Sequence, residues 1–265
     1  KCMMLRAHQT IGNSALKMRN KTLVEYYISV MKRYSKKLLS ITDIVVADAF
    51  FSTSTFEKGM SELGFYIVSR FRDNACLHYT PKREKRRGRP RVKGDKIDLA
   101  NLNLSCMEEL HIDGLDGKAY TLEAYAKALK RRVRLVIWRM PGGKCKLFFS
   151  IKLSMTGEEV LKTYRTRFQI EFCYRDSKQF TGLMDCQARH KRQLDFAFNA
   201  SFASLNAAKV FMKDNGMDNS MAKIKSLMFN ANYTKLIFDM SRCQPNRTLI
   251  SKIVKELIGW QPKAA

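Results

Sequence analysis

The chain has 265 residues, of which 45% are hydrophobic and 11% aromatic, so it has enough apolar material for one large core or two smaller ones. This composition excludes a chain that is mainly disordered. Lysine and arginine number 49 against 24 acidic residues, which gives a formal net charge of +25. So large an excess favours a polyanionic partner, and nucleic acid is the first candidate.

Two further classes are disfavoured by composition. No apolar run approaches the roughly 20 residues that span a bilayer, so we expect no membrane partner. The seven cysteines are scattered and form no Cys-x-x-Cys pair, and only four histidines accompany them. We therefore expect reduced thiols in a cytoplasmic protein rather than a zinc site or a disulfide framework. Any bound metal should have oxygen ligands, which points to the carboxylates.

The first part of the chain predicts a strand–helix–strand unit. Apolar residues recur at helical spacing over 21–39, which predicts an amphipathic helix. A β-branched run over 41–51 ends near Asp48, and Ser52 or Ser54 could cap a helix that continues through Leu63. Residues 65–71 predict a second strand. Strand, helix and strand at this spacing indicate a βαβ unit in a parallel sheet with helices on its faces.

The middle of the chain begins with a strongly basic segment and continues with β-strand patterns. In residues 82–96, nine of fifteen side chains are basic, and glycine and proline interrupt any helix. We expect a cationic loop that follows phosphates without reading bases; a merely solubilising loop is the alternative. Residues 131–140 and 144–153 flank Pro141-Gly142-Gly143 and predict a hairpin of two long strands.

The rest of the chain predicts helices. Thr156 begins a helical pattern that continues to about Phe180, and further helical stretches cover 191–213 and shorter segments to the end. Within the first helix, four residues fall in a stripe of roughly 60° at about 100° per residue: Tyr164, Arg167, Glu171 and Lys178. Leu161, Phe168 and Phe172 occupy the adjacent sector and are expected to pack on a sheet. The stripe suits a phosphate chain with a metal beside it, although an ordinary solvated face has the same composition.

The spacing Tyr-x2-Arg-x3-Glu-x6-Lys, within the text around IEFCYRDSKQFTGL, closely resembles the YREK signature of the DDE transposases of bacterial insertion sequences, in the insertion-sequence-four group. IVVADAFFS resembles the strand that ends in the family's second catalytic aspartate, here Asp48, and SRFRDNACLHY resembles the strand that follows. GRPRVKGDK resembles the start of the family's inserted β domain. Between Asp48 and Glu171 lie 122 residues, which fits a core with such an insertion.

The resemblance implies an α/β fold with an RNase H-like core of the retroviral integrase superfamily, an inserted β-rich domain and a helical C-terminal region. The expected domains are residues 1–80 as the first part of the core, 81–153 as the insertion, 154–214 as the second part of the core and 215–265 as the helical region. It further implies metal-dependent cleavage and transfer of double-stranded DNA at insertion-sequence ends. A homodimer in the synaptic complex and a place in the bacterial cytoplasm, at the nucleoid, are also implied.

The resemblance also assigns roles to residues. Asp48 and Glu171 would be catalytic carboxylates that hold Mg²⁺ or Mn²⁺, although Asp48 could instead cap the next turn. Tyr164, Arg167 and Lys178 would bind phosphates of the transposon end. Trp138 could stack on a displaced base, or it could be an ordinary core residue. The further DNA contacts expected from the basic loop are Arg89 and Arg91.

One part of the family pattern is missing. The first catalytic aspartate lies well upstream of the second, but only Glu25 and Asp43 precede Asp48, and neither fits. Glu25 falls on the predicted basic helix, and Asp43 lies on the same strand as Asp48 and on its opposite face. We therefore expect an N-terminally truncated transposase that is inactive as given. The alternatives are a noncatalytic DNA-binding remnant and, less favoured by the YREK spacing, an RNase H-like nuclease acting on RNA hybrids.

Overall fold

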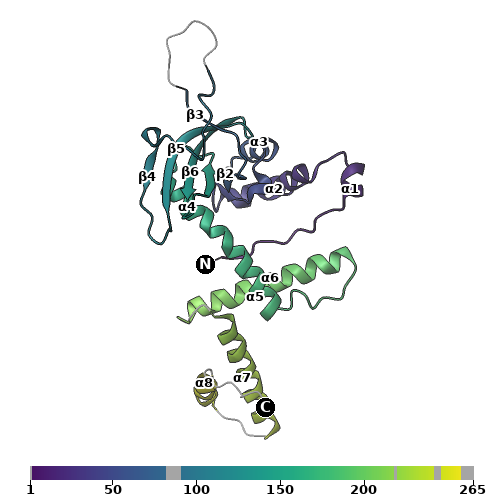
Figure 1. The fold of residues 1–265 in the computed structure, drawn as a ribbon. Helices are drawn as coiled ribbons and strands as arrows, with labels where there is room; N and C mark the ends of the chain where they lie inside the picture. Colours follow the sequence, from purple (N-terminus) through teal and green to yellow (C-terminus); the bar gives the residue numbers. More distant parts are fainter. Residues whose placement is uncertain (1, 82–90, 218–219, 242–245, 258–265) are drawn as a thin grey trace. The chain divides into compact units, whose positions relative to one another are not determined.

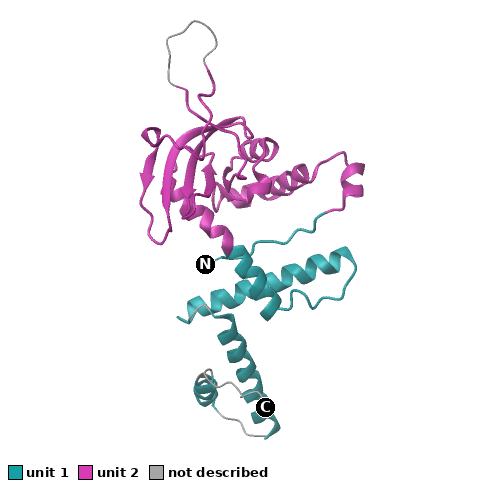
Figure 2. Cartoon of the chain, viewed as in Figure 1, with its two compact units in different colours: residues 1–10, 169–265 teal, residues 11–168 magenta. Residues whose placement is uncertain are grey.

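The computed structural model describes residues 2–81, 91–217, 220–241 and 246–257 (Figure 1). The chain divides into two compact units, which Figure 2 shows in different colours. Residues 11–168 form a mixed α/β unit, here called the sheet unit. Residues 1–10 and 169–265 form a second unit, here called the helical unit, in whose described part the regular elements are all helices.

The sheet unit is built on one seven-stranded sheet with the order β1-β2-β7-β6-β5-β3, and β4 pairs with β5 beside this path. The strands are β1 (Ile44–Val46), β2 (Tyr66–Arg70), β3 (Leu77–Tyr79), β4 (Glu108–Leu110), β5 (Lys118–Ala126), β6 (Arg131–Arg139) and β7 (Cys145–Ser150). The helices are α1 (Asn13–Met18), α2 (Leu23–Leu39), α3 (Ser54–Glu62) and α4 (Gly157–Arg165), with 3-10 turns η1 (Ala49–Phe51), η2 (Leu104–Cys106) and η3 (Thr166–Phe168). Strands from before and after residue 80 therefore belong to the same sheet.

The predicted strand–helix–strand unit is confirmed. β1 and β2 are parallel, with Val45 opposite Ile67, and α3 connects them. The helix is capped by Thr53, whose hydroxyl accepts from the Phe56 N–H, rather than by either neighbouring serine. Gly64 follows the helix with φ +88°, a conformation that suits glycine. In the part of the chain that the structure describes, β1 pairs only with β2 and is an edge strand.

The sheet has two apolar faces, and the alternation of side chains along its strands divides the core between them. Ile67 of β2, Leu135 of β6 and Phe149 of β7 pack in the cluster with residues of α2 and α3. Their sequence neighbours Val68, Val136 and Phe148 pack in a second cluster with Leu161 and Tyr164 of α4. Period-2 alternation thus gives α2 and α3 one face of the sheet and α4 the other.

Parallel pairing, expected for the strand–helix–strand unit, is found there, and the rest of the sheet is antiparallel. Only β1 and β2 pair in parallel, whereas β2–β7, β7–β6, β6–β5 and the pairs of β5 with β3 and β4 are antiparallel. The predicted hairpin is confirmed as β6 and β7, with Arg139 opposite Cys145. Short connections join β4 to β5, β5 to β6 and β6 to β7, and only antiparallel neighbours can be joined in this way.

The helical unit consists of α5 (Gln169–Phe180), α6 (Lys191–Asp214), α7 (Met221–Met240) and α8 (Arg247–Glu256). Cys173, Leu205, Met212 and Ile224 form its buried cluster. The chain's first residues pack onto α6 through two asparagines. Asn206 accepts from the Met4 N–H at 2.9 Å and donates to the Met4 carbonyl at 2.7 Å, and Asn199 makes the same pair of contacts with Ala7.

None of the helices within the described ranges is both long and apolar enough to cross a membrane.

Candidate nucleic-acid interface

A cavity of about 460 Å³ in the sheet unit collects four of the residues that the sequence singled out. Its walls come from the end of β1 and β2, the β6–β7 hairpin, and the last turn of α4 with η3. The lining residues are Asp48, Arg70, Trp138, Lys146, Phe148, Leu161, Tyr164, Arg165, Arg167 and Phe168. One cavity therefore brings together four predicted residues: Asp48, Trp138, Tyr164 and Arg167. Asp48 and Tyr164 are 116 positions apart in the sequence.

Asp48 is held at the carboxyl end of β1 by the turn that follows. Its Oδ1 accepts from the Phe50 N–H at 2.9 Å, so the capping role considered for this residue is present. Its backbone carbonyl accepts from the buried Ser69 hydroxyl at 2.9 Å, and Ser52 donates to the Arg70 carbonyl at 2.8 Å. These bonds connect the end of β1 to the end of β2. The Asp48 residue remains exposed, and none of the hydrogen bonds among described residues engages its Oδ2.

The opposite wall depends on the start of α4, which is confirmed at the predicted place. Thr156 and Glu159 form a reciprocal capping box that fixes the first turn. Eight residues further along, the Tyr164 ring is only 7% exposed and packs on Phe148 with ring centroids 4.9 Å apart. Arg167 lies over the Phe168 ring at 4.8 Å. The buried aromatic pair anchors this wall on the sheet, and the two arginines at 165 and 167 follow it.

The single helix expected from Thr156 to Phe180 is wrong. A 3-10 turn, η3, separates α4 from α5, and its three residues per turn break the uniform 100° spacing on which the 60° stripe was calculated. Phe168 and Phe172, expected to be buried, are 50% and 48% exposed, whereas Leu161 is buried as expected. Tyr164 and Arg167 belong to the sheet unit, and Glu171 and Lys178 belong to the helical unit.

The remaining predicted residues belong to other segments of the chain. Glu171 is in the first turn of α5 and Lys178 in its last turn, and both are exposed. The pairing of Asp48 with Glu171 over a metal therefore stays a prediction. Arg91 is exposed in the segment before β4 and does not line the cavity, while Arg89 falls outside the described residues, as does most of the expected basic loop.

Trp138 reaches the cavity from the β6–β7 hairpin. It is partly buried against the core face of α4, and its indole N–H donates to the Asp116 carbonyl at 2.7 Å. Lys146, directly opposite in the hairpin, lies over the indole at 4.9 Å. Trp138 thus packs against the core cluster under α4 and also lines the cavity.

Three cations of the cavity were not predicted: Arg70, Lys146 and Arg165. Each looks like an ordinary surface cation in the sequence. The hairpin prediction contained a usable signal for one of them, because a turn over residues 140–144 places Lys146 opposite Trp138. Together with Arg167, these residues give the cavity four cations beside one carboxylate. Such a surface attracts a polyanion and still presents a hard oxygen ligand.

The two upstream carboxylates have structural partners. Glu25 completes the capping box of α2, and the bond from the Thr22 N–H lowers the pKa of its carboxyl below the usual value. Asp43 accepts from the Lys152 ammonium at 2.8 Å, which lowers the Asp43 pKa. Within the described ranges, no three His, Cys, Asp or Glu side chains gather in a group that could hold a metal.

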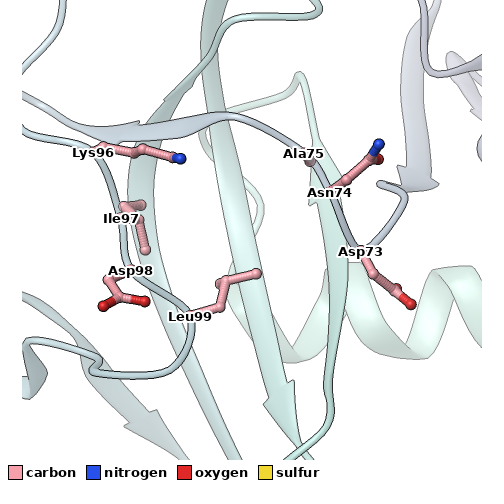
Figure 3. Close-up of a pocket in the computed structure, with 7 residues that line it drawn as sticks. All are labelled: Asp73, Asn74, Ala75, Lys96, Ile97, Asp98 and Leu99. Atoms are coloured by element: carbon pink, nitrogen blue, oxygen red, sulfur yellow. The ribbon is translucent and has the colours of Figure 1, made fainter.

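A second cavity of about 430 Å³ contains two carboxylates, but its side chains do not converge. Figure 3 shows Asp73 and Asp98 on separate segments, with Leu99 between them. Asp98 turns toward its own loop, accepting from the Ala100 N–H at 2.9 Å and from the Asn101 amide at 3.2 Å. The Ala100 bond is the main cause of a lowered pKa at Asp98. Among the described residues, Lys96 is the one basic side chain that lines this cavity, whereas four basic side chains line the cavity around Arg167.

Comparison with models of protein families gives no match for this chain, and a search of curated proteins finds no relative.

Proposed function

We propose that this chain is part of a DDE transposase of the YREK insertion-sequence group. Its reaction would be metal-dependent cleavage and transfer of DNA strands at insertion-sequence ends, on double-stranded DNA in the bacterial cytoplasm, at the nucleoid, with a homodimer holding two ends. The proposed fold of the sheet unit, together with the helix of Glu171, is an RNase H-like core extended by the strands after β2.

The observation that supports this proposal is the shared cavity of Asp48, Trp138, Tyr164 and Arg167. The sequence singled out these residues from three separate segments because of their resemblance to one family. Because all four residues line one cavity, their proposed roles would be carried out at one place. The mixed α/β architecture, with Asp48 at the carboxyl end of a parallel strand, is compatible with the same assignment.

In this function the cavity cations would bind the DNA backbone. Arg70, Lys146 and Arg167 approach from three different elements, so they can contact successive phosphates and fix the strand in one register. The partly exposed Trp138 ring offers an apolar face for an unstacked base, and Lys146 above it can contact that nucleotide's phosphate.

Asp48 fits the requirement for a hard metal ligand. Its carboxylate is exposed, and the Phe50 N–H bond holds Oδ1 in place. Mg²⁺ is commonly held by one or two carboxylates together with substrate phosphates and water, so Asp48 with Glu171 would supply the protein's share. When bound, the metal would activate the attacking oxygen and stabilise the departing one.

A noncatalytic DNA-binding remnant is the second candidate. The observation that favours it is that Asp48 alone supplies a carboxylate to a cavity with four cations. Binding would then be driven by phosphate neutralisation, with no strand cleavage. Both candidates predict the same DNA affinity, and they differ in whether the protein cleaves the DNA strand.

Cleavage of a labelled insertion-sequence end in Mg²⁺ separates these candidates. The assay uses this sequence joined to an upstream strand that carries the first aspartate. Asp48→Ala and Glu171→Ala are each expected to lower the cleavage rate by at least about a hundredfold, because each removes a metal ligand. Glu108→Ala, an exposed carboxylate on β4, is the matched control. Cleavage by both variants at the parental rate would exclude the enzyme, and DNA binding without cleavage in the parent would favour the remnant.

DNA affinity tests the interface with a closely matched pair of lysines. Lys146 lines the cavity, whereas Lys144, two residues earlier in the same hairpin, is exposed and does not. Lys146→Ala is expected to weaken binding to a random duplex about fivefold and to reduce the slope of log K against log salt by about one. Fluorescence anisotropy at several salt concentrations gives both quantities. Equal effects of Lys144→Ala and Lys146→Ala would mean that the cavity is not the binding surface.

A further inference from the structure

A third cavity, in the sheet unit, is lined by a thiol that stands beside an imidazole. It measures about 550 Å³ and is lined by Ala49, Phe50, Ser52, Thr53, Phe71, Arg72, Asn74, Ala75, Cys76, Lys127 and Ala128. Cys76 stands just before β3, two residues from His78, so both side chains project from the same face of the strand. The Cys76 sulfur lies 3.5 Å from His78 Nε2.

The orientation of the imidazole is fixed from its other side. His78 Nδ1 lies 3.1 Å from the Gly94 carbonyl oxygen, which can only accept a hydrogen bond. Nδ1 therefore carries the hydrogen, and in the neutral ring Nε2 is left with a lone pair that faces the Cys76 thiol. The backbone holds Gly94 in place, because its N–H donates to the Tyr79 carbonyl at 2.8 Å. A nucleophile, a base and a group that orients the base thus stand in sequence.

The surroundings of this pair are cationic. Arg72 and Lys127 line the cavity together with Cys76, and the Lys127 N–H donates to the Cys76 carbonyl at 3.1 Å. On either side of β3, Lys96, in an isolated bridge, and Tyr125 of β5 stand directly opposite His78. These cations stabilise negative charge that develops on the sulfur and attract an anionic reagent, while Phe50 and Phe71 give the cavity apolar walls.

We propose that Cys76 is a reactive thiol and a site of mixed-disulfide formation with anionic small-molecule disulfides. The Cys76 thiol gives its proton to His78 Nε2, and the sulfur attacks one sulfur of the incoming disulfide. A new S–S bond forms, the old one breaks, and the other half of the reagent leaves as a thiolate, which takes up a proton. The exchange needs no further oxidant, since the disulfide is itself the co-reactant.

The other cysteines of the same chain provide the reference for a test. Cys106 is exposed and Cys173 is buried, and the described residues place an imidazole beside neither of them. The full chain is treated with oxidised glutathione at pH 7, quenched with acid, digested and analysed by mass spectrometry. Cys76 is expected to form the mixed disulfide at least about tenfold faster than Cys106, because His78 can take up the proton as the Cys76 sulfur attacks. A rate equal to or below that of Cys106 would overturn the proposal.

Two further arms test the base and the charge. His78→Asn retains a donor that can reach the Gly94 carbonyl but removes the Nε2 base, so the rate advantage of Cys76 over Cys106 should fall at least fivefold. Protection of Cys145, a partly buried thiol that packs on the core of the same unit as His78, reports that the variant remains folded, and where it does not, the wild-type ratio alone decides. Cystamine, a cationic disulfide, should react with Cys76 more slowly than oxidised glutathione does, relative to Cys106. An unchanged ratio with His78→Asn, or equal selectivity for cystamine, would contradict the proposed site.

Discussion

At the scale of single residues, the sequence predicted those members of the cavity whose chemistry is distinctive. Asp48 ends a β-branched run, Trp138 is one of only two tryptophans, and Tyr164 and Arg167 belong to a spaced signature. Arg70 and Lys146 could not be found in this way, because 49 lysines and arginines make any one of them inconspicuous. Their selection depends on strand register, which brings Arg70 opposite Phe148 and Lys146 opposite Trp138.

Another feature at this scale is an ion pair between the segment after β7 and the segment before β1. Lys152, just after β7, pairs with Asp43, just before β1, and lies over the Tyr66 ring at 5.0 Å. The hydrogen bond lowers the Asp43 pKa and raises the Lys152 pKa. The Asp43 contribution to stability is therefore complete above its ordinary pKa and is lost as pH falls through the lowered value. The Lys152 contribution is complete below its ordinary pKa and is lost as pH rises through the raised value.

The pH dependence of Lys152→Met follows from these signs. The free energy of unfolding of the variant should fall below that of the wild type by a constant amount between about pH 5 and pH 9. The gap should narrow below about pH 4, as the Asp43 carboxyl takes up its proton. Urea titrations at pH 7 and pH 3 measure it, with Lys144→Met as the exposed control. A gap of the same size at both pH values would show that the ion pair contributes nothing.

At the scale of elements, the helices α2, α3 and α6 and the β6–β7 hairpin were predicted because each has a clear period and a recognisable turn or cap. The central strand β5 was not. Its sequence, KAYTLEAYA, has three alanines together with a lysine, a leucine and a glutamate, residues that favour helix, and its pattern does not identify it as a strand. Pairing with β6 on one side and with β3 and β4 on the other overrides that preference.

The contact between α4 and the sheet gives an element-scale prediction. A Cβ at Gly157, the first residue of α4, would lie 2.6 Å from Thr121 Cβ and 2.6 Å from Leu110 Cδ1. Gly157→Ala should therefore destabilise the protein by about 1 to 3 kcal/mol through overpacking, although alanine is the better helix former by about 1 kcal/mol. Gly12→Ala is the control, because a Cβ there has no atom of another residue within 4 Å. Thermal unfolding measures both, and a stabilised Gly157→Ala would contradict the close approach.

At the scale of the whole molecule, the observed division differs from any boundary suggested by composition. The two units meet in the sequence at residues 10/11 and 168/169, and the second of these points is inside the segment expected to be one helix. Composition reveals the basic stretch at 82–96 but says nothing about strand partners, and the sheet runs through residues on both sides of that stretch. The sequence also showed no sign that the first ten residues pack with the C-terminal helices. Asn199 and Asn206 of α6 hold this extended segment across about 200 residues of sequence.

The position of β1 at the border of the sheet determines what can be added next to Asp48. Its outward-facing N–H and C=O groups can accept another extended segment by backbone pairing, from the same polypeptide or from a second one. An added strand parallel to β1 would end beside the end of β1, so its last side chains would come within reach of the Asp48 carboxylate. The chemistry available at that corner is thus set by whichever strand occupies the neighbouring place.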